Sequence, residues 1–188
     1  MEYLGPKENP FVFRRFEASL HSEKDLENLK NRLRPLLGEE ASEQCAFVLR
    51  SLADENFQND CEQATQEFGR RLTHRFGDEE SFFDLAPRAK FSDARSYKFL
   101  SNSGKILDHH SVGLLEFNPP KGRPFSLAFD LTYGDVFGSL KKDPISVFCT
   151  PGTRERTLEV LKNHYGGSWK VEYEFDPRTG NFVSRREK

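Results

Sequence analysis

The sequence is poor in cysteine and contains no long apolar segment. Its three cysteines, Cys45, Cys61 and Cys149, are too few and of odd number for a disulfide framework, which indicates a reducing compartment. Apolar runs extend over only a few residues, as in 46–49, so no segment is long enough to span a bilayer. Residues 1–10 have neither the basic nor the apolar region of a secretory signal peptide. We therefore expect a cytoplasmic protein that does not bind membranes.

Motifs for known cofactors and common catalytic reactions are also missing. The sequence has no P-loop, no dinucleotide-binding glycine fingerprint, no His-Glu-x-x-His zinc motif, no Cys-x-x-Cys pair and no serine nucleophile elbow. These absences predict no cofactor and no metal, and they favour a protein that is not an enzyme. An enzyme built on other residues is still compatible with them.

Phenylalanine, in contrast, is abundant, with 18 residues in a chain of 188. Each Phe side chain that leaves water on folding contributes roughly 1.5–3 kcal/mol, and disordered chains lack such large apolar groups. The chain is long enough for one sizeable hydrophobic core. We predict a single folded domain over residues 1–188, with a core built mainly on Phe and Leu.

Helical periodicity dominates the first part of the chain, residues 1–86, after a short predicted strand at 11–16. Ser22 offers a helix N-cap with Asp25 as the capping acid, and Gly38 offers a stop. The helices predicted here cover residues 22–38, 41–52, 56–76 and 78–85. The strongest apolar stripe, with spacings of three and four, consists of Phe57, Cys61, Ala64, Phe68, Leu72 and Phe76.

Strand alternation dominates the second part, residues 87–188. The strands predicted here cover residues 97–100, 105–107, 112–117, 125–132, 145–149, 169–175 and 181–184. Helices and strands that are segregated along the chain favour an α+β fold, with the helices on one face of a mostly antiparallel sheet. A helix beginning at Thr153 makes residues 145–175 a strand–helix–strand unit.

A triplet of metal-binding and basic side chains, Asp108-His109-His110, follows the strand predicted at 105–107. Carboxylate and imidazole groups serve as metal ligands and general bases. The triplet resembles the Asp-His-His signature of the DHH phosphoesterases, and this resemblance implies hydrolysis of a phosphate ester. No further aspartate element precedes Asp108 to complete such a site, so a polar strand end beside a hairpin turn is the competing interpretation.

The segment 149–156 places Cys149 at a strand end, before a turn and a helix start. It resembles the phosphate loop of cysteine-based phosphatases, which implies a cysteine nucleophile and a phosphate-binding arginine. The spacing departs from that family because Glu155 stands where its arginine belongs. The competing interpretations are a buried core cysteine and a helix N-terminus that binds an anion without catalysis. The predicted anion-binding residues are Gly152, Thr153, Arg154 and Arg156.

Two aspartates, Asp130 and Asp135, flank the end of another predicted strand and form a third pair of candidates. Paired carboxylates bind divalent metals or share acid–base chemistry. The following strand, 145–149, lacks the Glu-x-Lys of a nuclease of the restriction-enzyme type. Because Asp130 alternates with the apolar Phe129 and Leu131, the pattern predicts that it faces solvent.

The charge is unevenly distributed along the chain. Residues 1–118 carry 16 basic and 21 acidic side chains, and residues 119–188 carry 12 basic and 9 acidic ones, giving nets of −5 and +3. The predicted helices between residues 39 and 68 hold eight acids and a single base, Arg50. This excess suits a basic protein partner, whereas a net of +3 in the second part is a weak signal for nucleic acid.

These patterns favour an accessory protein that acts by binding another protein. The first alternative is a phosphate-ester hydrolase or nuclease, which would use Asp108, His109 and His110, or else Cys149 with Arg154. The second alternative is a nucleic-acid-binding module that uses the basic second part of the chain.

Overall fold

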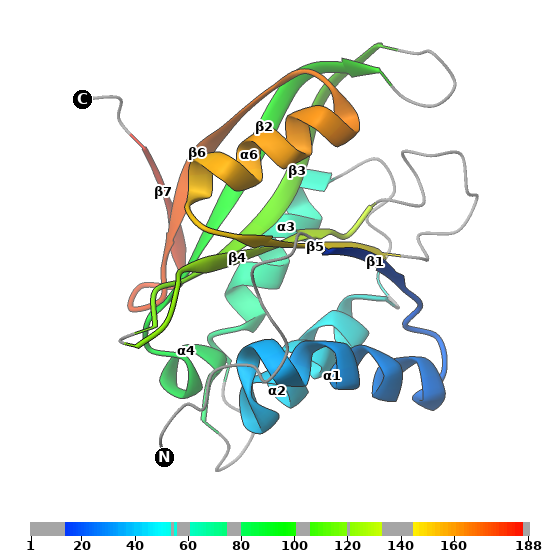
Figure 1. Ribbon diagram of the computed structural model, residues 1–188, viewed down its shortest axis with the longest axis vertical. Helices are drawn as coiled ribbons and strands as arrows, with labels where there is room; N and C mark the ends of the chain where they lie inside the picture. Colours follow the sequence, from blue (N-terminus) through cyan, green and yellow to red (C-terminus); the bar gives the residue numbers. More distant parts are fainter. Residues whose placement is uncertain are drawn as a thin grey trace.

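The computed structural model describes residues 14–53, 55, 61–74, 80–100, 106–119, 121–132 and 145–185, with the side chains of 97–100 and 106–108 left out. Within these ranges, helices flank both faces of one antiparallel sheet (Figure 1). The helices are α1 (Glu23–Leu37), α2 (Glu39–Ala53), α3 (Cys61–Arg71), α4 (Phe82–Leu85) and α6 (Arg154–Tyr165). The strands are β1 (Arg14–Ala18), β2 (Ala89–Leu100), β3 (Ile106–Phe117), β4 (Phe125–Asp130), β5 (Ile145–Pro151), β6 (Ser168–Asp176) and β7 (Asn181–Ser184). The predicted α+β class is confirmed.

The sheet has the strand order β1-β5-β4-β3-β2-β6-β7, and each neighbouring pair is antiparallel. The strands predicted at 105–107 and 112–117 are parts of one strand, β3, which pairs along its length with β2. β5 and β6 run in the same direction because three antiparallel strands separate them, and α6 connects them across the sheet. The predicted strand–helix–strand unit is therefore present.

Helices α1 to α4 pack on one face of the sheet and share a core with it. The predicted N-cap of α1 is confirmed, since the Asp25 N–H donates to the Ser22 hydroxyl at 3.1 Å. Pro35 does not end α1, which continues to Leu37 and stops at Gly38 with a φ of 83°. Gly38 adopts this left-handed conformation without the steric strain of a side chain.

Helix α3 lies directly against the sheet and carries part of the predicted apolar stripe. Phe68 is fully buried and meets the rings of Phe91 and Phe129 edge-on, with centroid distances of 5.5 and 5.2 Å. A Cβ atom at Gly69 would lie 2.7 Å from the Phe91 ring, and one at Gly113 would lie 2.9 Å from it. Two glycines thus allow helix and sheet to approach closely. The predicted stripe residues Phe57 and Phe76 lie outside the described residues.

Helix α6 covers the opposite face of the sheet, so the prediction that the helices lie on one face is wrong for this element (Figure 1). Leu161 and Tyr165 of α6 pack there on apolar side chains such as Val112 and Phe148. The prediction that Asp130 faces solvent is also wrong, because this face is covered and Asp130 is fully buried. Its partner in the third candidate pair, Asp135, lies outside the described residues.

No helix in the described part of the chain is long and apolar enough to cross a membrane.

Candidate functional site

The sheet opens between β3 and β4. Their last paired residues are Gly113 and Phe129; beyond this point β3 continues beside β2, while Asp130 pairs with Ser146 of β5. Figure 1 shows β3 turning away together with β2, with the start of α3 behind the opening. His110 and Asp130 lie on the two strands just past the last pair. The divergence therefore creates a place where side chains from three elements can meet.

His110 and Asp130 form a buried hydrogen-bonded pair across this opening. The His110 Nε2 atom lies 2.9 Å from Asp130 Oδ2, and the two side chains are 1% and 0% exposed. Asp130 Oδ2 also accepts a hydrogen bond from the Tyr165 hydroxyl at 2.5 Å, and Asp130 Oδ1 accepts one from the Thr132 N–H at 3.1 Å. The carboxylate is thus held in one orientation with one oxygen directed at the imidazole.

Cys61, the first residue of α3, lies on the other side of His110. Its sulfur accepts a hydrogen bond from the Ser111 N–H at 3.3 Å, and its side chain also hydrogen-bonds to His110. Because the Nε2 atom of His110 is used by Asp130, the Nδ1 atom is the one available to Cys61. The three side chains therefore form a chain in the order Cys61, His110, Asp130.

The position of Cys61 beside His110 is relevant to its chemistry. A cysteine next to a basic imidazole has the surroundings in which cysteine acts as a nucleophile. Cys61 is 8% exposed, so it is buried but less completely than His110 or Asp130.

The protonation of His110 is set by its two polar neighbours. Burial alone would lower the pKa of His110, but the charge and hydrogen bond of Asp130, together with Cys61, raise it from 6.5 to about 10. The ring is further enclosed by Tyr165 and Trp169, with centroid distances of 5.5 and 5.9 Å. These aromatic groups exclude water from the His110–Asp130 hydrogen bond and strengthen it.

A second buried charged cluster fixes the start of α3 to β2. Arg95 donates two hydrogen bonds to Asp93 Oδ2, at 3.0 and 2.8 Å, and lies 2.8 Å from the Glu62 carboxylate. Its guanidinium group also stacks on the Tyr173 ring at 4.7 Å. Since Glu62 follows Cys61 directly, Arg95 restrains the residue next to the sulfur.

The structure separates the members of the Asp108-His109-His110 triplet. Successive residues of a strand point to opposite faces, and accordingly His109 is exposed whereas His110 is buried. The side chain of Asp108 lies outside the described residues. Within the described part of the chain no group of three His, Cys, Asp or Glu side chains is arranged to hold a metal ion. His110 instead takes part in the chain with Cys61 and Asp130.

Cys149 and Arg154 are not brought together either. Cys149 is buried on the face that packs against α1 to α4, and burial raises the pKa of its thiol to about 11 despite the nearby Arg14. Arg154 lies on the face covered by α6, where it pairs with Glu116 at 2.9 and 2.5 Å and with Glu174 at 3.1 Å. A thiol on one face and a guanidinium group on the other cannot act on one phosphate.

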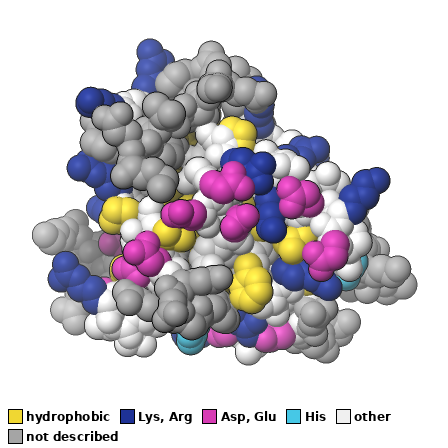
Figure 2. Space-filling view, turned by 90° about the horizontal axis from the view of Figure 1, so that it is seen from below, with side chains coloured by type: hydrophobic (Ala, Val, Ile, Leu, Met, Phe, Trp, Pro, Cys, Tyr) yellow, Lys and Arg dark blue, Asp and Glu magenta, His cyan; other side chains and the backbone are white. Residues whose placement is uncertain are grey.

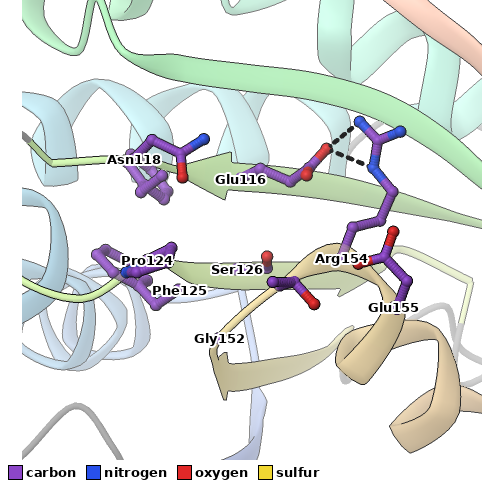
Figure 3. A pocket seen from close by; sticks show the side chains of 10 residues that line it. Glu116, Asn118, Pro124, Phe125, Ser126, Gly152, Arg154 and Glu155 are labelled. Atoms are coloured by element: carbon purple, nitrogen blue, oxygen red, sulfur yellow. Dashed lines mark hydrogen bonds and ion pairs between the residues drawn. The ribbon is translucent and has the colours of Figure 1, made fainter.

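Three of the predicted anion-binding residues, Gly152, Thr153 and Arg154, border a pocket of about 240 Å³ at the start of α6 (Figure 3). Figure 3 shows Arg154 reaching across to Glu116 rather than into an open space. The Gly152 N–H donates to the Pro124 carbonyl at 2.8 Å. Glu155 hydrogen-bonds to its own N–H and to Thr153, which lowers its pKa. The carboxylates of Glu116, Glu174 and Glu155 therefore already neutralise the positive charge at the start of α6. Arg156 is exposed beside it, and binding of phosphate there stays a prediction.

Sequence reasoning missed the chain formed by Cys61, His110 and Asp130. Cys61 fits the apolar stripe of α3 and Asp130 fits the polar positions of β4, so each has a structural explanation of its own. The occurrence of a Cys, a His and an Asp in this chain order was the signal available. No protein-family model, no curated protein and no solved structure matches the chain.

Proposed function

We propose that this protein is a cysteine-dependent enzyme that transfers or hydrolyses an acyl group. Cys61 is the nucleophile, His110 is the general base and acid, and Asp130 orients the imidazole. The observation that carries the proposal is that His110 lies between two partners, with Nε2 hydrogen-bonded to Asp130 and the Cys61 side chain as its other hydrogen-bond partner. A nucleophile, a base and an orienting acid in this arrangement recur on unrelated folds.

The reaction follows from these roles. In its neutral form His110 takes the thiol proton of Cys61 through Nδ1, and the thiolate attacks the carbonyl carbon of the substrate. The tetrahedral intermediate then collapses, and the leaving group departs with the proton from His110, which leaves a thioester on Cys61. Water or another nucleophile, deprotonated by His110, attacks this thioester and releases the acyl group, which restores the thiol.

The first expected result concerns selective modification of Cys61 by iodoacetamide. In the folded protein at pH 6.5, Cys61 should be alkylated well before Cys45 and Cys149, which are 0% and 4% exposed. Replacing His110 with asparagine should slow the alkylation of Cys61 by about 10-fold or more, because the imidazolium that stabilises the thiolate is lost. Peptide mapping by mass spectrometry after timed quenching gives the rate at each cysteine.

The neighbouring histidine supplies a matched control for this experiment. His109→Asn removes an exposed histidine one residue away and should leave the rate at Cys61 unchanged.

Incubation with p-nitrophenyl acetate tests acyl transfer itself, since a working nucleophile acquires an acetyl group at Cys61. Equal alkylation rates in the wild type and His110→Asn, with no acetyl group on Cys61, would contradict the proposal.

A second candidate function, binding of a basic protein, is favoured by one surface of α2. Most described acids of the 39–68 segment are paired with arginines of the chain itself. Within the described residues, Glu40 and Glu43 are exposed and form no ion pair, and the 48% exposed Phe47 follows one turn later on the same helix. Figure 2 looks onto the side of α1 and α2 and shows acidic groups beside apolar ones, with basic groups among them. A partner segment with lysines or arginines around an apolar residue complements this surface.

The second expected result tests this surface directly. A fluorescent lysine-rich peptide containing one leucine should bind the wild type, and the double variant Glu40→Gln, Glu43→Gln should bind it about 5- to 10-fold more weakly at low salt. Glu159→Gln, which removes an exposed acid on α6, is the matched control. If the double variant and the control bind alike, the α2 surface is only a solvated helix face.

A further inference from the structure

Tyr165 connects α6 to the proposed catalytic chain through a single oxygen atom. Its hydroxyl donates to Asp130 Oδ2, the same atom that lies 2.9 Å from His110 Nε2. Tyr165 is the last residue of α6, and the Gly166 N–H closes the helix there by donating to the Lys162 carbonyl at 2.7 Å. The tyrosine is 4% exposed. Two donors therefore share one acceptor in a site from which water is excluded.

We infer that Tyr165 is a positioning residue for the proposed nucleophile pair, which regulates through Asp130 how firmly His110 holds its proton. Two donors on one oxygen each weaken the other, because each draws negative charge from the same acceptor. The other carboxylate oxygen is fixed by Thr132, so the orientation of Asp130 does not depend on Tyr165 alone. The main effect of the phenol is therefore on the strength of the His110–Asp130 hydrogen bond.

This effect matters because His110 has two opposite tasks in the proposed reaction. It must accept the proton of Cys61 and must later give a proton to the leaving group, and a base that holds its proton too firmly is a poor acid. Groups described around His110 include Asp130 from β4, Cys61 from α3 and Tyr165 from α6, with Trp169 of β6 as an apolar neighbour. His164 of α6, which packs on the Tyr165 ring, also interacts with the charge of Asp130. Tyr165 draws charge from the Asp130 carboxylate by a hydrogen bond and contributes no charge of its own.

The test is Tyr165→Phe in the full-length chain, which keeps the ring and removes the hydroxyl. With histidine labelled by ¹⁵N, the Nε2 proton of His110 should move downfield in the variant, and the pH midpoint of the His110 titration should rise above that of the wild type. Tyr173→Phe makes the same chemical change on the other face of the sheet, beside Arg95, and should leave both signals of His110 unchanged.

The two possible failures can be told apart because this spectroscopic measurement does not require a reactive Cys61. An unchanged His110 signal and titration in Tyr165→Phe would overturn the inference and reduce Tyr165 to a packing residue. An upfield shift with a lower midpoint would overturn it as well, since Tyr165 would then strengthen the pair. A downfield shift in a protein whose Cys61 is not acylated would support the inference and contradict the proposed acyl transfer, on which the catalytic meaning of Tyr165 rests.

Discussion

Replacing Phe68 with alanine is expected to lower the free energy of unfolding by about 3–5 kcal/mol. The side chain is fully buried between α3 and the sheet, against the rings of Phe91 and Phe129. Its removal leaves a cavity that cannot close easily, because Gly69 and Gly113 already bring helix and sheet into the closest approach. Equilibrium denaturation with urea, followed by circular dichroism, measures the loss.

A substitution of the same size on the surface is the control for Phe68. Phe47 of α2 is 48% exposed, and Phe47→Ala should lower the free energy of unfolding by no more than about 1 kcal/mol, as is typical away from the core. If Phe68→Ala costs as little as Phe47→Ala, the apolar stripe of α3 does not form the core. Because Cys61 and Phe68 lie on the same helix, the Phe68 variant should also lose selective alkylation at Cys61.

Replacing Asp130 with asparagine is expected to destabilise the protein by about 3–5 kcal/mol near pH 6.5, because breaking a buried charged pair leaves the other member unpaired. The substitution keeps the shape of the side chain and removes its charge. The stability of the wild type should fall as the pH rises from 6.5 towards 10, since folded His110, with its pKa raised to about 10, keeps a proton that the unfolded chain has released. In this window the loss approaches about 1.4 kcal/mol per pH unit.

Comparing the pH dependence of stability in the wild type and in Asp130→Asn separates the contribution of the His110–Asp130 pair from that of other groups that titrate in the alkaline range. In Asp130→Asn the part of the pH dependence due to His110 should disappear, because the carboxylate that holds the proton is gone. Adding His110→Asn to Asp130→Asn should recover part of the lost stability, because residues that contact each other do not act additively. A wild type whose stability stays constant from pH 6.5 to 10 would show that His110 is neutral when folded.

Much of the fold could be predicted because its local signals are strong. The cap at Ser22, the glycine stop at Gly38 and the apolar stripe through Phe68 all act over a few residues, and the structure confirms them. The placement of α6 was harder to predict. Its apolar face is narrow, with Leu161 and Tyr165 buried alongside Thr157, and nothing in such a pattern says which face of a distant sheet the helix covers.

The candidate site was missed for the same physical reason. Asp130 alternates with apolar residues, as a solvent-facing residue of a strand does. It is nevertheless buried, because α6, which begins 24 residues later in the chain, covers this face of the sheet. Cys61 and His110 are brought together because β3 leaves β4 after Gly113, and this divergence depends on tertiary packing. The sequence identified His110 as chemically interesting, but it suggested Asp108 and His109 as partners when the partners are Cys61 and Asp130.

The outer strands of the sheet limit the ways in which this protein can assemble. β7 has four residues, and the described part of β1 carries the charged side chains Arg14, Arg15 and Glu17. Short and charged edges give another chain little backbone to pair with, which is how natural sheets avoid growing into fibres. Any partner or polypeptide substrate is therefore expected to be recognised through side-chain surfaces, without extending the sheet by an added strand.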